Sequence, residues 1–358
     1  MRRTAIVPVF PMLLIIAFIA AVCLETLSNP SRGPVVGPSG YQLLKKISAG
    51  GDGGWDYLTV DPAARRLYIS RQTRVMVFDL DSEKLAGEIP NTTGVHGIAI
   101  ASDLGRGFTS NGRDNSVTIF DLKNLNVLNT VKISGKNPDA IIYDPASHRV
   151  FTFNGTSKDA TAIDARTGNV AGTVTLPGRP EFACSDEKGM VFVNLEDKNE
   201  VVAIDSNKLA VKAEWSLGAG QSPTGLAIDR KHHRLFSGCA GNQKMIVLDS
   251  ENGHVVADLP IGRGVDATAF DPDKDLAFAS AGDGTLTVIR EDSVDKFEVL
   301  ESVPTQRFAR TMALDSKTHN VYLVTAEYGP PPTAAAGQQQ RARGDLVPGS
   351  FAILVVGK

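Results

Sequence analysis

Seven residues with ionisable or polar side chains recur along the chain at nearly equal intervals. They are Asp56, His96, Asp139, Glu181, Thr224, Asp266 and Arg310. Carboxylates that lie close together repel one another, so such a group raises the pKa of some members or recruits a cation. His96 is the member whose ordinary pKa lies near neutral pH. The set predicts a binding site for a cationic group, a metal or a polar ligand. The alternative is a water-filled polar channel in which Arg310 pairs with a carboxylate.

The identity of a metal or cofactor is left open by these residues. His96 is the one nitrogen ligand in the set, and carboxylate oxygens suit Ca²⁺ or Mg²⁺ better than Zn²⁺. Each residue comes from a different part of the chain, so there is no ligand spacing that could support a metal site. We therefore predict ligand-binding residues and assign neither a metal nor a catalytic residue.

The elements that must position these residues form a tandem repeat of about 42 residues. Five positions after each of the seven comes an aspartate column with one substitution: Asp61, Ala101, Asp144, Asp186, Asp229, Asp271 and Asp315. An aromatic column follows: Tyr68, Phe108, Phe151, Phe192, Phe236, Phe278 and Tyr322. Segments of four to seven β-branched, alternating residues are separated by turn pairs such as Asn111-Gly112 and Asp283-Gly284. This pattern indicates short strands and excludes a helical repeat.

Four short strands per repeat are typical of a propeller blade, so seven repeats predict an all-β, seven-bladed β-propeller over residues 41–358. The last repeat lacks a fourth strand, and residues 41–48 resemble one. We therefore expect the N-terminal strand to pair with residues 351–356, complete the last blade and cover its open edge. First strands line the channel of a propeller, which would gather the seven recurring residues at one mouth.

The repeats resemble the YVTN-type, YncE-like family of bacterial propellers over about residues 41–358. The resemblance rests on the first strand of residues 223–229, Pro-Thr-Gly-Leu-Ala-Ile-Asp, and on the third strand of residues 115–121, Asn-Ser-Val-Thr-Ile-Phe-Asp. It implies the fold and leaves the function open, because such blades occur in scaffold, binding and surface proteins and resemble parts of lactonases and of cofactor-dependent oxidoreductases.

The N-terminus reads as an export signal. Arg2 and Arg3 precede an apolar stretch, and a Pro-rich polar spacer follows it. We predict a signal peptide or an N-terminal anchor over residues 1–28 and a linker over 29–40, hence a periplasmic or secreted protein, with membrane anchoring as the alternative. Cys184 and Cys239 are interpreted as small buried residues, with a disulfide between them as the alternative.

Two other segments carry expectations. Residues 329–350 form a Pro-, Ala- and Gln-rich insertion between the second and third strands of the last repeat, on the side of the predicted mouth. It is interpreted as a flexible loop, with a lid or partner tether as the alternative. Residues 231–234, Lys-His-His-Arg, fall on a hairpin turn and are expected to be exposed.

The leading functional hypothesis is a monomeric binding scaffold for a protein, a peptide or a small polar ligand at the insertion-bearing face. The 37 basic and 40 acidic residues give a net charge of −3, which disfavours nucleic acid as a partner. The alternative is a lactonase-like hydrolase or a cofactor-dependent oxidoreductase acting at the mouth. An enzyme predicts that several mouth side chains converge on one point, whereas a scaffold predicts an open channel.

Overall fold

The structure is a computed structural model that describes residue 1, residues 37–330 and residues 344–358. The chain divides into the units Met1–Val35 and Val36–Lys358, and the account below concerns the second. The predicted signal segment of residues 1–28, most of the linker and the centre of the 329–350 insertion lie outside the described residues. Among the residues that are described, no helix is long and apolar enough to cross a membrane.

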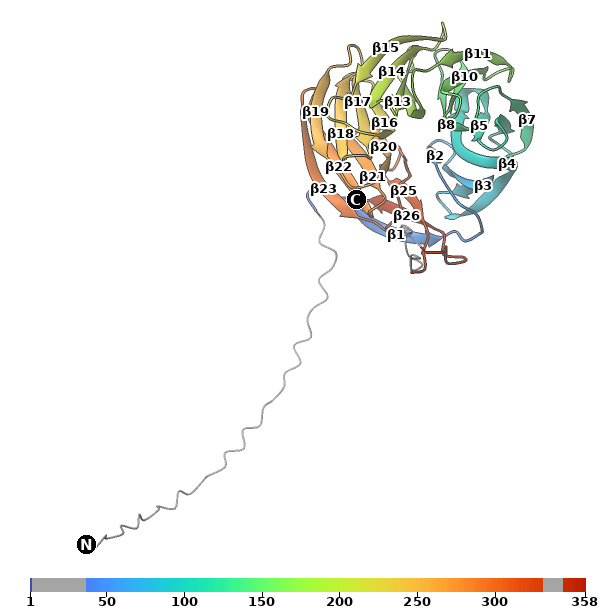
Figure 1. Ribbon diagram of the computed structural model, residues 1–358. Coiled ribbons are helices and arrows are strands. Elements are labelled where there is room, and N and C mark those ends of the chain that lie inside the picture. The colour runs from blue at the N-terminus through green and yellow to red at the C-terminus, as the bar shows by residue number, and fades with distance from the viewer. Residues whose placement is uncertain (2–36, 331–343) are drawn as a thin grey trace. The chain divides into compact units, whose positions relative to one another are not determined.

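The described part of the second unit is built almost entirely of antiparallel strands arranged in a ring of sheets (Figure 1). Five sheets have four strands each. In spatial order they are β8 (Pro138–Asp144), β9 (Arg149–Asn154), β10 (Asp159–Asp164) and β11 (Val170–Thr175); β12 (Pro180–Ser185), β13 (Met190–Leu195), β14 (Glu200–Asp205) and β15 (Ala210–Ser216); β16 (Pro223–Asp229), β17 (Arg234–Cys239), β18 (Lys244–Asp249) and β19 (Val255–Pro260); β20 (Val265–Asp271), β21 (Leu276–Ala281), β22 (Thr285–Ser293) and β23 (Lys296–Pro304); and β24 (Met312–Leu314), β25 (Val321–Thr325), β26 (Ala352–Gly357) and β1 (Gln42–Ser48).

The sixth sheet has six strands and corrects the predicted architecture. It contains β2 (Leu58–Asp61), β3 (Arg66–Asp79), β4 (Lys84–Ala101), β5 (Arg106–Asn111), β6 (Ser116–Asp121) and β7 (Val127–Lys132), with the short 3₁₀ helix η1 (Ser102–Leu104) between β4 and β5. The all-β propeller is confirmed, but the prediction of seven blades was wrong, because the described residues form six sheets.

The difference arises at β4, which pairs with β3 through its first half and with β5 through its second. Two consecutive repeats therefore share one sheet. Residues 91–94 have the polar composition of a turn, yet the strand continues through them. Asn91 and Gly94 take up the bend with positive φ angles of 62° and 72°.

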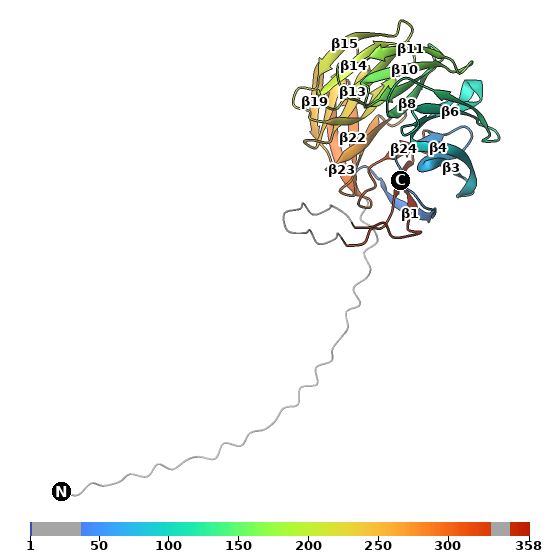
Figure 2. The ribbon, with the colours of Figure 1, turned by 45° about the vertical axis from the view of Figure 1, so that its right-hand side comes forward.

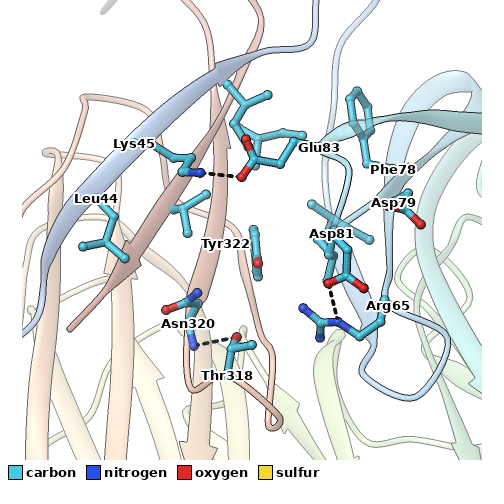
Figure 3. A pocket seen from close by; sticks show the side chains of 15 residues that line it. Leu44, Lys45, Arg65, Phe78, Asp79, Asp81, Glu83, Thr318, Asn320 and Tyr322 are labelled. Carbon is cyan, nitrogen blue, oxygen red and sulfur yellow. Dashed lines mark hydrogen bonds and ion pairs between the residues drawn. The ribbon is translucent and has the colours of Figure 1, made fainter.

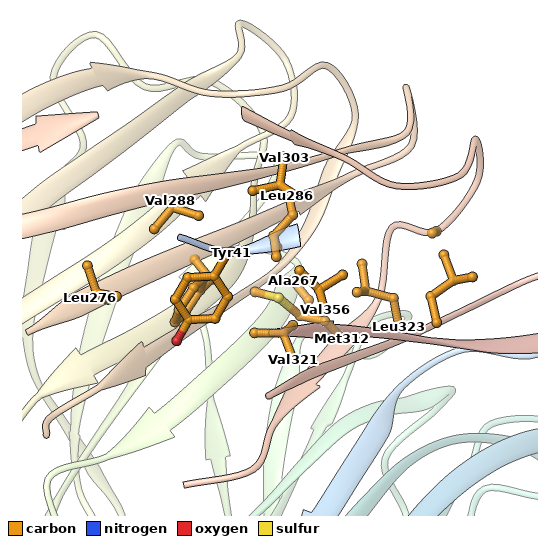
Figure 4. Packing of buried hydrophobic residues seen from close by; sticks show 13 residues of the cluster. Tyr41, Ala267, Leu276, Leu286, Val288, Val303, Met312, Val321, Leu323 and Val356 are labelled. Carbon is orange, nitrogen blue, oxygen red and sulfur yellow. The ribbon is translucent and has the colours of Figure 1, made fainter. Parts of the chain in front are cut away.

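The two ends of the described unit lie side by side. β1 pairs antiparallel with β26, with Leu43 opposite Val356 and Ser48 opposite Ala352 (Figures 1 and 2). Just before β1, the buried ring of Tyr41 packs edge-on against Phe278, with 5.1 Å between ring centroids, in an apolar cluster shared with Leu286 and Val356 (Figure 4). The N-terminal strand thus contacts both the sheet of β26 and the sheet of β21.

The aspartate and aromatic columns shape each hairpin. Asp229, for example, accepts hydrogen bonds from the backbone N–H groups of Lys231 and His232, which closes the turn after β16. The aromatic column is buried throughout: Tyr68, Phe108, Phe151, Phe192, Phe236, Phe278 and Tyr322. Apolar clusters join neighbouring sheets, as where Phe151 and Val174 pack with Val193 and Ile204. The sheets therefore hold one another by face-to-face burial.

Candidate functional site

The mouth of the ring is built from residues at the start of each repeat's first strand. Asp139, Glu181, Thr224 and Asp266 are the second residues of β8, β12, β16 and β20, His96 lies in β4, and Asp56 and Arg310 precede β2 and β24. Because these strands begin at the same end of the ring, residues far apart in the sequence come close together.

Three of the predicted residues converge on one point. His96 Nδ1 lies 2.6 Å from Asp56 Oδ2 and 3.5 Å from Asp139 Oδ1. One ligand atom from each of the three residues lies within 4.8 Å of the other two. Beside them, a hollow of about 200 Å³ is lined by Trp55 and Arg113 as well as by Asp56 and His96.

Two further predicted residues form an ion pair, and a third, Thr224, uses its hydroxyl within the fold. Arg310 Nε lies 3.2 Å from Asp266 Oδ2, and the arginine side chain is 55% exposed. The hydroxyl of Thr224 is buried and donates to the backbone carbonyls of Val265, at 2.9 Å, and Gly238. Thr224 therefore ties neighbouring strands together rather than presenting a free hydroxyl.

Tyr57 is a site residue that the sequence analysis missed. It is buried, and its ring lies 5.0 Å from that of Phe182 in β12, a strand of a sheet that does not neighbour β2. Tyr57 and Phe182 each follow a mouth carboxylate by one residue, and Gly97 and Gly225 occupy the same position in other repeats. The two rings meet one residue along the chain from Asp56 and Glu181, so an aromatic pair lies next to the mouth carboxylates. The mouth together with this aromatic pair is called the basin below.

Polar side chains of the second strands hold the mouth strands in place. The Ser110 hydroxyl in β5 accepts from the backbone N–H of Gly97, at 2.9 Å, and donates to the carbonyl of Asp139 in the next repeat. Asn194 in β13 likewise donates to the carbonyls of Thr224 and Gly225. Ser110 thus links the first strands of two consecutive repeats, and Asn194 links β13 to the first strand of the next repeat.

Glu181, Asp266 and Asp139 hold their protons unusually tightly. Burial, with the charges of Asp139 and Asp266, raises the pKa of Glu181 to about 8. Burial also raises the pKa of Asp266 to about 7, although Arg310 opposes this, and raises the pKa of Asp139 to about 6, although His96 opposes it. Carboxyl groups that remain partly protonated near pH 7 are ready to exchange those protons for a cation.

The pKa values of the basic groups are raised as well, which keeps these groups charged. Burial alone would lower the pKa of His96, but its hydrogen bond to Asp56 and the charge of Asp139 raise it to about 9. The charge of Asp266 raises the pKa of Arg310. Burial and then the charges of Asp139 and Glu181 raise the pKa of Tyr57 well above its usual value. At neutral pH, His96 and Arg310 are thus cationic among carboxyl groups that they neutralise only in part.

The described flanks of the 329–350 insertion reach this basin. Trp55, next to Asp56, lies 5.1 Å from the ring of Phe351 and 6.4 Å from that of Tyr328. Tyr328 also packs edge-on against Phe308 at 4.9 Å. Both ends of the insertion are therefore aromatic neighbours of the mouth.

A larger hollow, of about 390 Å³, lies away from the mouth, between β1, β25 and the turn after β3 (Figure 3). Two ion pairs lie in its lining: Lys45 with Glu83, and Arg65 Nε with Asp81 Oδ1 at 3.0 Å. The rest of the lining is mixed, because Asp79, Thr318 and Asn320 stand beside aliphatic side chains such as Leu44. The hollow does not contain any of the predicted site residues.

The two cysteines and residues 231–234 were the subject of further predictions. Cys184 and Cys239 are free thiols, so the alternative of a disulfide between them is not realised. The expected exposure of residues 231–234 was wrong for Arg234, whose side chain is 8% exposed and pairs with Asp249. His232 also turns inward, to lie between two carboxylates.

Comparisons with known proteins concern the fold. The chain matches no family model and no curated protein. Among solved structures it is similar to U3-55K, with 11% identity, a TM-score of 0.71, and coverage of 88% of this chain and 98% of that chain. The WD40 repeats of RRP9 give 12% identity and a TM-score of 0.71, covering 88% and 97% of the two chains.

A chain of the mitotic checkpoint complex gives 14% identity and a TM-score of 0.70, covering 87% of this chain and 95% of that chain. Similarity at this level of identity shows the fold alone. It establishes a β-propeller, and the resemblance to YVTN-type, YncE-like repeats stays a prediction from the sequence.

Proposed function

We propose that this chain is an exported binding scaffold that holds a partner protein or peptide at its channel mouth, with a basic side chain of the partner seated among Asp56, Asp139, Glu181 and Asp266. The observation that carries the proposal is the convergence of Asp56 and Asp139 on His96 beside the aromatic pair of Tyr57 and Phe182. Glu181 and Asp266 lie near enough for their charges to act on this group.

The surroundings of the basin support a macromolecular partner. The aromatic side chains of Trp55, Tyr328 and Phe351 lie at its edge, and aromatic residues are enriched where proteins bind one another. The insertion that joins Tyr328 to Phe351 would contribute further contacts. The similarity to WD40 propellers, one of them solved within a protein complex, is consistent with a scaffold role. The N-terminal pattern supports export, and an exported chain would meet its partner in the periplasm or outside the cell.

The test uses Trp55 as a reporter. The chain has two tryptophans, and Trp215→Phe leaves Trp55 as the single fluorophore beside the mouth. Titration with a tri-lysine peptide amide should shift its emission in a saturable and salt-sensitive manner, because screening weakens charge attraction. Asp139→Asn with Glu181→Gln in the same background should abolish the shift. A tri-glutamate peptide is the control ligand, and an equal response to both peptides would overturn the proposal.

A second candidate, an acid–base enzyme acting at the mouth, is favoured by one observation. His96, protonated beside Asp56 at 2.6 Å, and Glu181, with a pKa of about 8, are two groups in one basin that can donate a proton. Hydrolysis of simple lactones by the wild-type chain, lost in His96→Gln, would favour the enzyme. Binding of basic peptides without turnover would favour the scaffold.

A further inference from the structure

A second group of ionisable residues lies at the end of the first strands remote from the mouth, between the sheets of β16 and β20. Glu291, in β22, has a side chain that is 1% exposed. Neither of its oxygens has a hydrogen-bond partner among the described residues. An ionised carboxylate buried in this way destabilises the fold unless a positive charge compensates it.

Two more ligand atoms point at the same place. Asp229, which ends β16, has a side chain that is 2% exposed, and His232 follows it in the turn. His232 Nδ1 lies 2.7 Å from Asp229 Oδ2 and 3.1 Å from Glu291 Oε1. This nitrogen carries at most one proton, so it could serve only one of the two carboxylates at a time. The angles at the nitrogen do not form a hydrogen bond with either carboxylate.

Two other repeats show how the equivalent aspartate can be satisfied. Asp315 receives a hydrogen bond from Arg65 at 2.6 Å, and Asp271 contacts His319 at 2.8 Å. Arg65 and His319 each stand four residues after the aspartate position of the next repeat. In the repeat that follows Asp229, this position is Asp275, whose charge also acts on Glu291. A carboxylate therefore stands where those two repeats have a donor.

Arg234, two residues after His232, does not supply the missing charge. Arg234 Nη1 lies 2.9 Å from Asp249 Oδ2, and Arg234 Nε donates to the carbonyl of Val294. No lysine or arginine of the described chain forms an ion pair with Asp229 or Glu291. The group is thus a buried set of two carboxylates and one imidazole without a cationic side chain.

We propose that Asp229, His232 and Glu291 bind a divalent transition-metal ion that joins the two sheets. One ligand atom from each residue lies within 4.8 Å of the other two, which places all three around a common point. Two carboxylates balance the charge of a divalent ion. The imidazole nitrogen favours Zn²⁺ and its neighbours over Mg²⁺ and Ca²⁺. With three protein ligands, a fourth position of Zn²⁺ is left for water.

The test is calorimetric titration of Zn²⁺ into the full-length chain after treatment with a chelator. Every protein carries Asp139→Asn, so that the mouth does not compete for the ion. We expect one tight site whose affinity falls in Glu291→Gln by more than the 10- to 100-fold that loss of an outer-shell partner typically costs. Zn²⁺ should also raise the melting temperature of the parent and leave that of Glu291→Gln unchanged.

His319→Gln is the matched control, because it alters the equivalent pair at Asp271 and should leave the affinity for Zn²⁺ unchanged. If Glu291→Gln fails to fold, His232→Asn provides the same comparison through loss of the nitrogen ligand. Equal Zn²⁺ affinity in the parent and the ligand variants, or no binding by the parent, would overturn the proposal. It would assign the three residues to a proton-sharing group instead.

Discussion

At the scale of single residues, the mouth combines proximity with burial. Glu181, Asp266 and Asp139 hold protons at pH values where free carboxyl groups have lost them. The pKa of Glu181 rises from 4.5 to about 8, so between these values the folded protein binds a proton that the unfolded chain has released. Such a group contributes stability below its unfolded pKa, and this contribution is lost as pH rises through the folded value.

We therefore expect the free energy of unfolding to fall as pH rises from 5 to 8. His96, with a pKa raised to about 9, should extend the decline above pH 8, because its folded pKa also exceeds its unfolded value. Glu181→Gln removes the titrating group with little change of shape and should flatten the decline between pH 5 and 8. Urea denaturation at several pH values measures it.

The exposed Glu214 provides the control for this measurement, since Glu214→Gln should leave the profile as in the wild type. If the free energy of unfolding of the wild type does not change from pH 5 to 8, the pKa of Glu181 is not raised in the folded protein. Its carboxyl group would then be ionised at neutral pH.

At the scale of strands, the mouth depends on hydroxyl groups that bridge two repeats. Ser110 is buried and satisfies the N–H of Gly97 and the carbonyl of Asp139 together. Ser110→Ala should destabilise the protein by about 1–3 kcal/mol, because it leaves buried backbone groups without partners. It should also weaken binding of a basic peptide by releasing the strand of Asp139. Urea denaturation and the Trp55 titration measure the two effects.

The exposed Ser82 is the matched control, and Ser82→Ala should change the free energy of unfolding by less than about 0.5 kcal/mol. Loss of stability in Ser110→Ala with unchanged peptide binding would mean that the mouth does not need this bridge. Equal stability of the two variants would contradict the bridging role itself.

The repeating columns of residues explain how much of the fold and of the mouth the sequence could predict. The columns led by Asp61 and Tyr68 marked the hairpins, because a turn needs its capping carboxylate and a sheet needs its buried ring at fixed positions. Counting back five residues from the aspartate column led to Asp56, His96 and Asp139, which the structure brings together. Strand register is periodic, so a residue's place along its strand can be read from the repeat.

Features that depend on contacts between repeats were beyond that method. Tyr57 meets Phe182 across the ring, and His232 meets Glu291 between sheets; neither pair has a fixed separation in the sequence. The small residues Gly97 and Gly225, in the position that the two bulky rings occupy in their own repeats, were the available signal for the aromatic pair. Asp275, in a position that holds a donor in two other repeats, was the signal for the second acidic group.

At the scale of the whole molecule, the ring of sheets includes a junction at which β1 pairs with β26 and joins the two ends of the described unit. The sequence showed which segments repeat, but the merging of two repeats in one sheet through β4 depends on the path of residues 91–94. At the junction, Tyr41 packs against Phe278 and donates a hydrogen bond to the carbonyl of His319 at 3.1 Å. One side chain thus contacts two sheets that follow each other in the ring.

Tyr41→Ala should lower the free energy of unfolding by about 3–5 kcal/mol, the usual cost of removing a buried aromatic ring. Tyr41→Phe keeps the ring and should cost only about 0.5–1.5 kcal/mol for the lost hydrogen bond. If the ring of sheets unfolds as one cooperative unit, denaturation of Tyr41→Ala will remain a single transition seen equally by Trp55 and Trp215 fluorescence. Trp55 packs against Phe351 next to β26, whereas Trp215 lies in β15. A transition that reaches Trp55 at lower urea than Trp215 would therefore show that the junction opens locally while the remaining sheets stay folded.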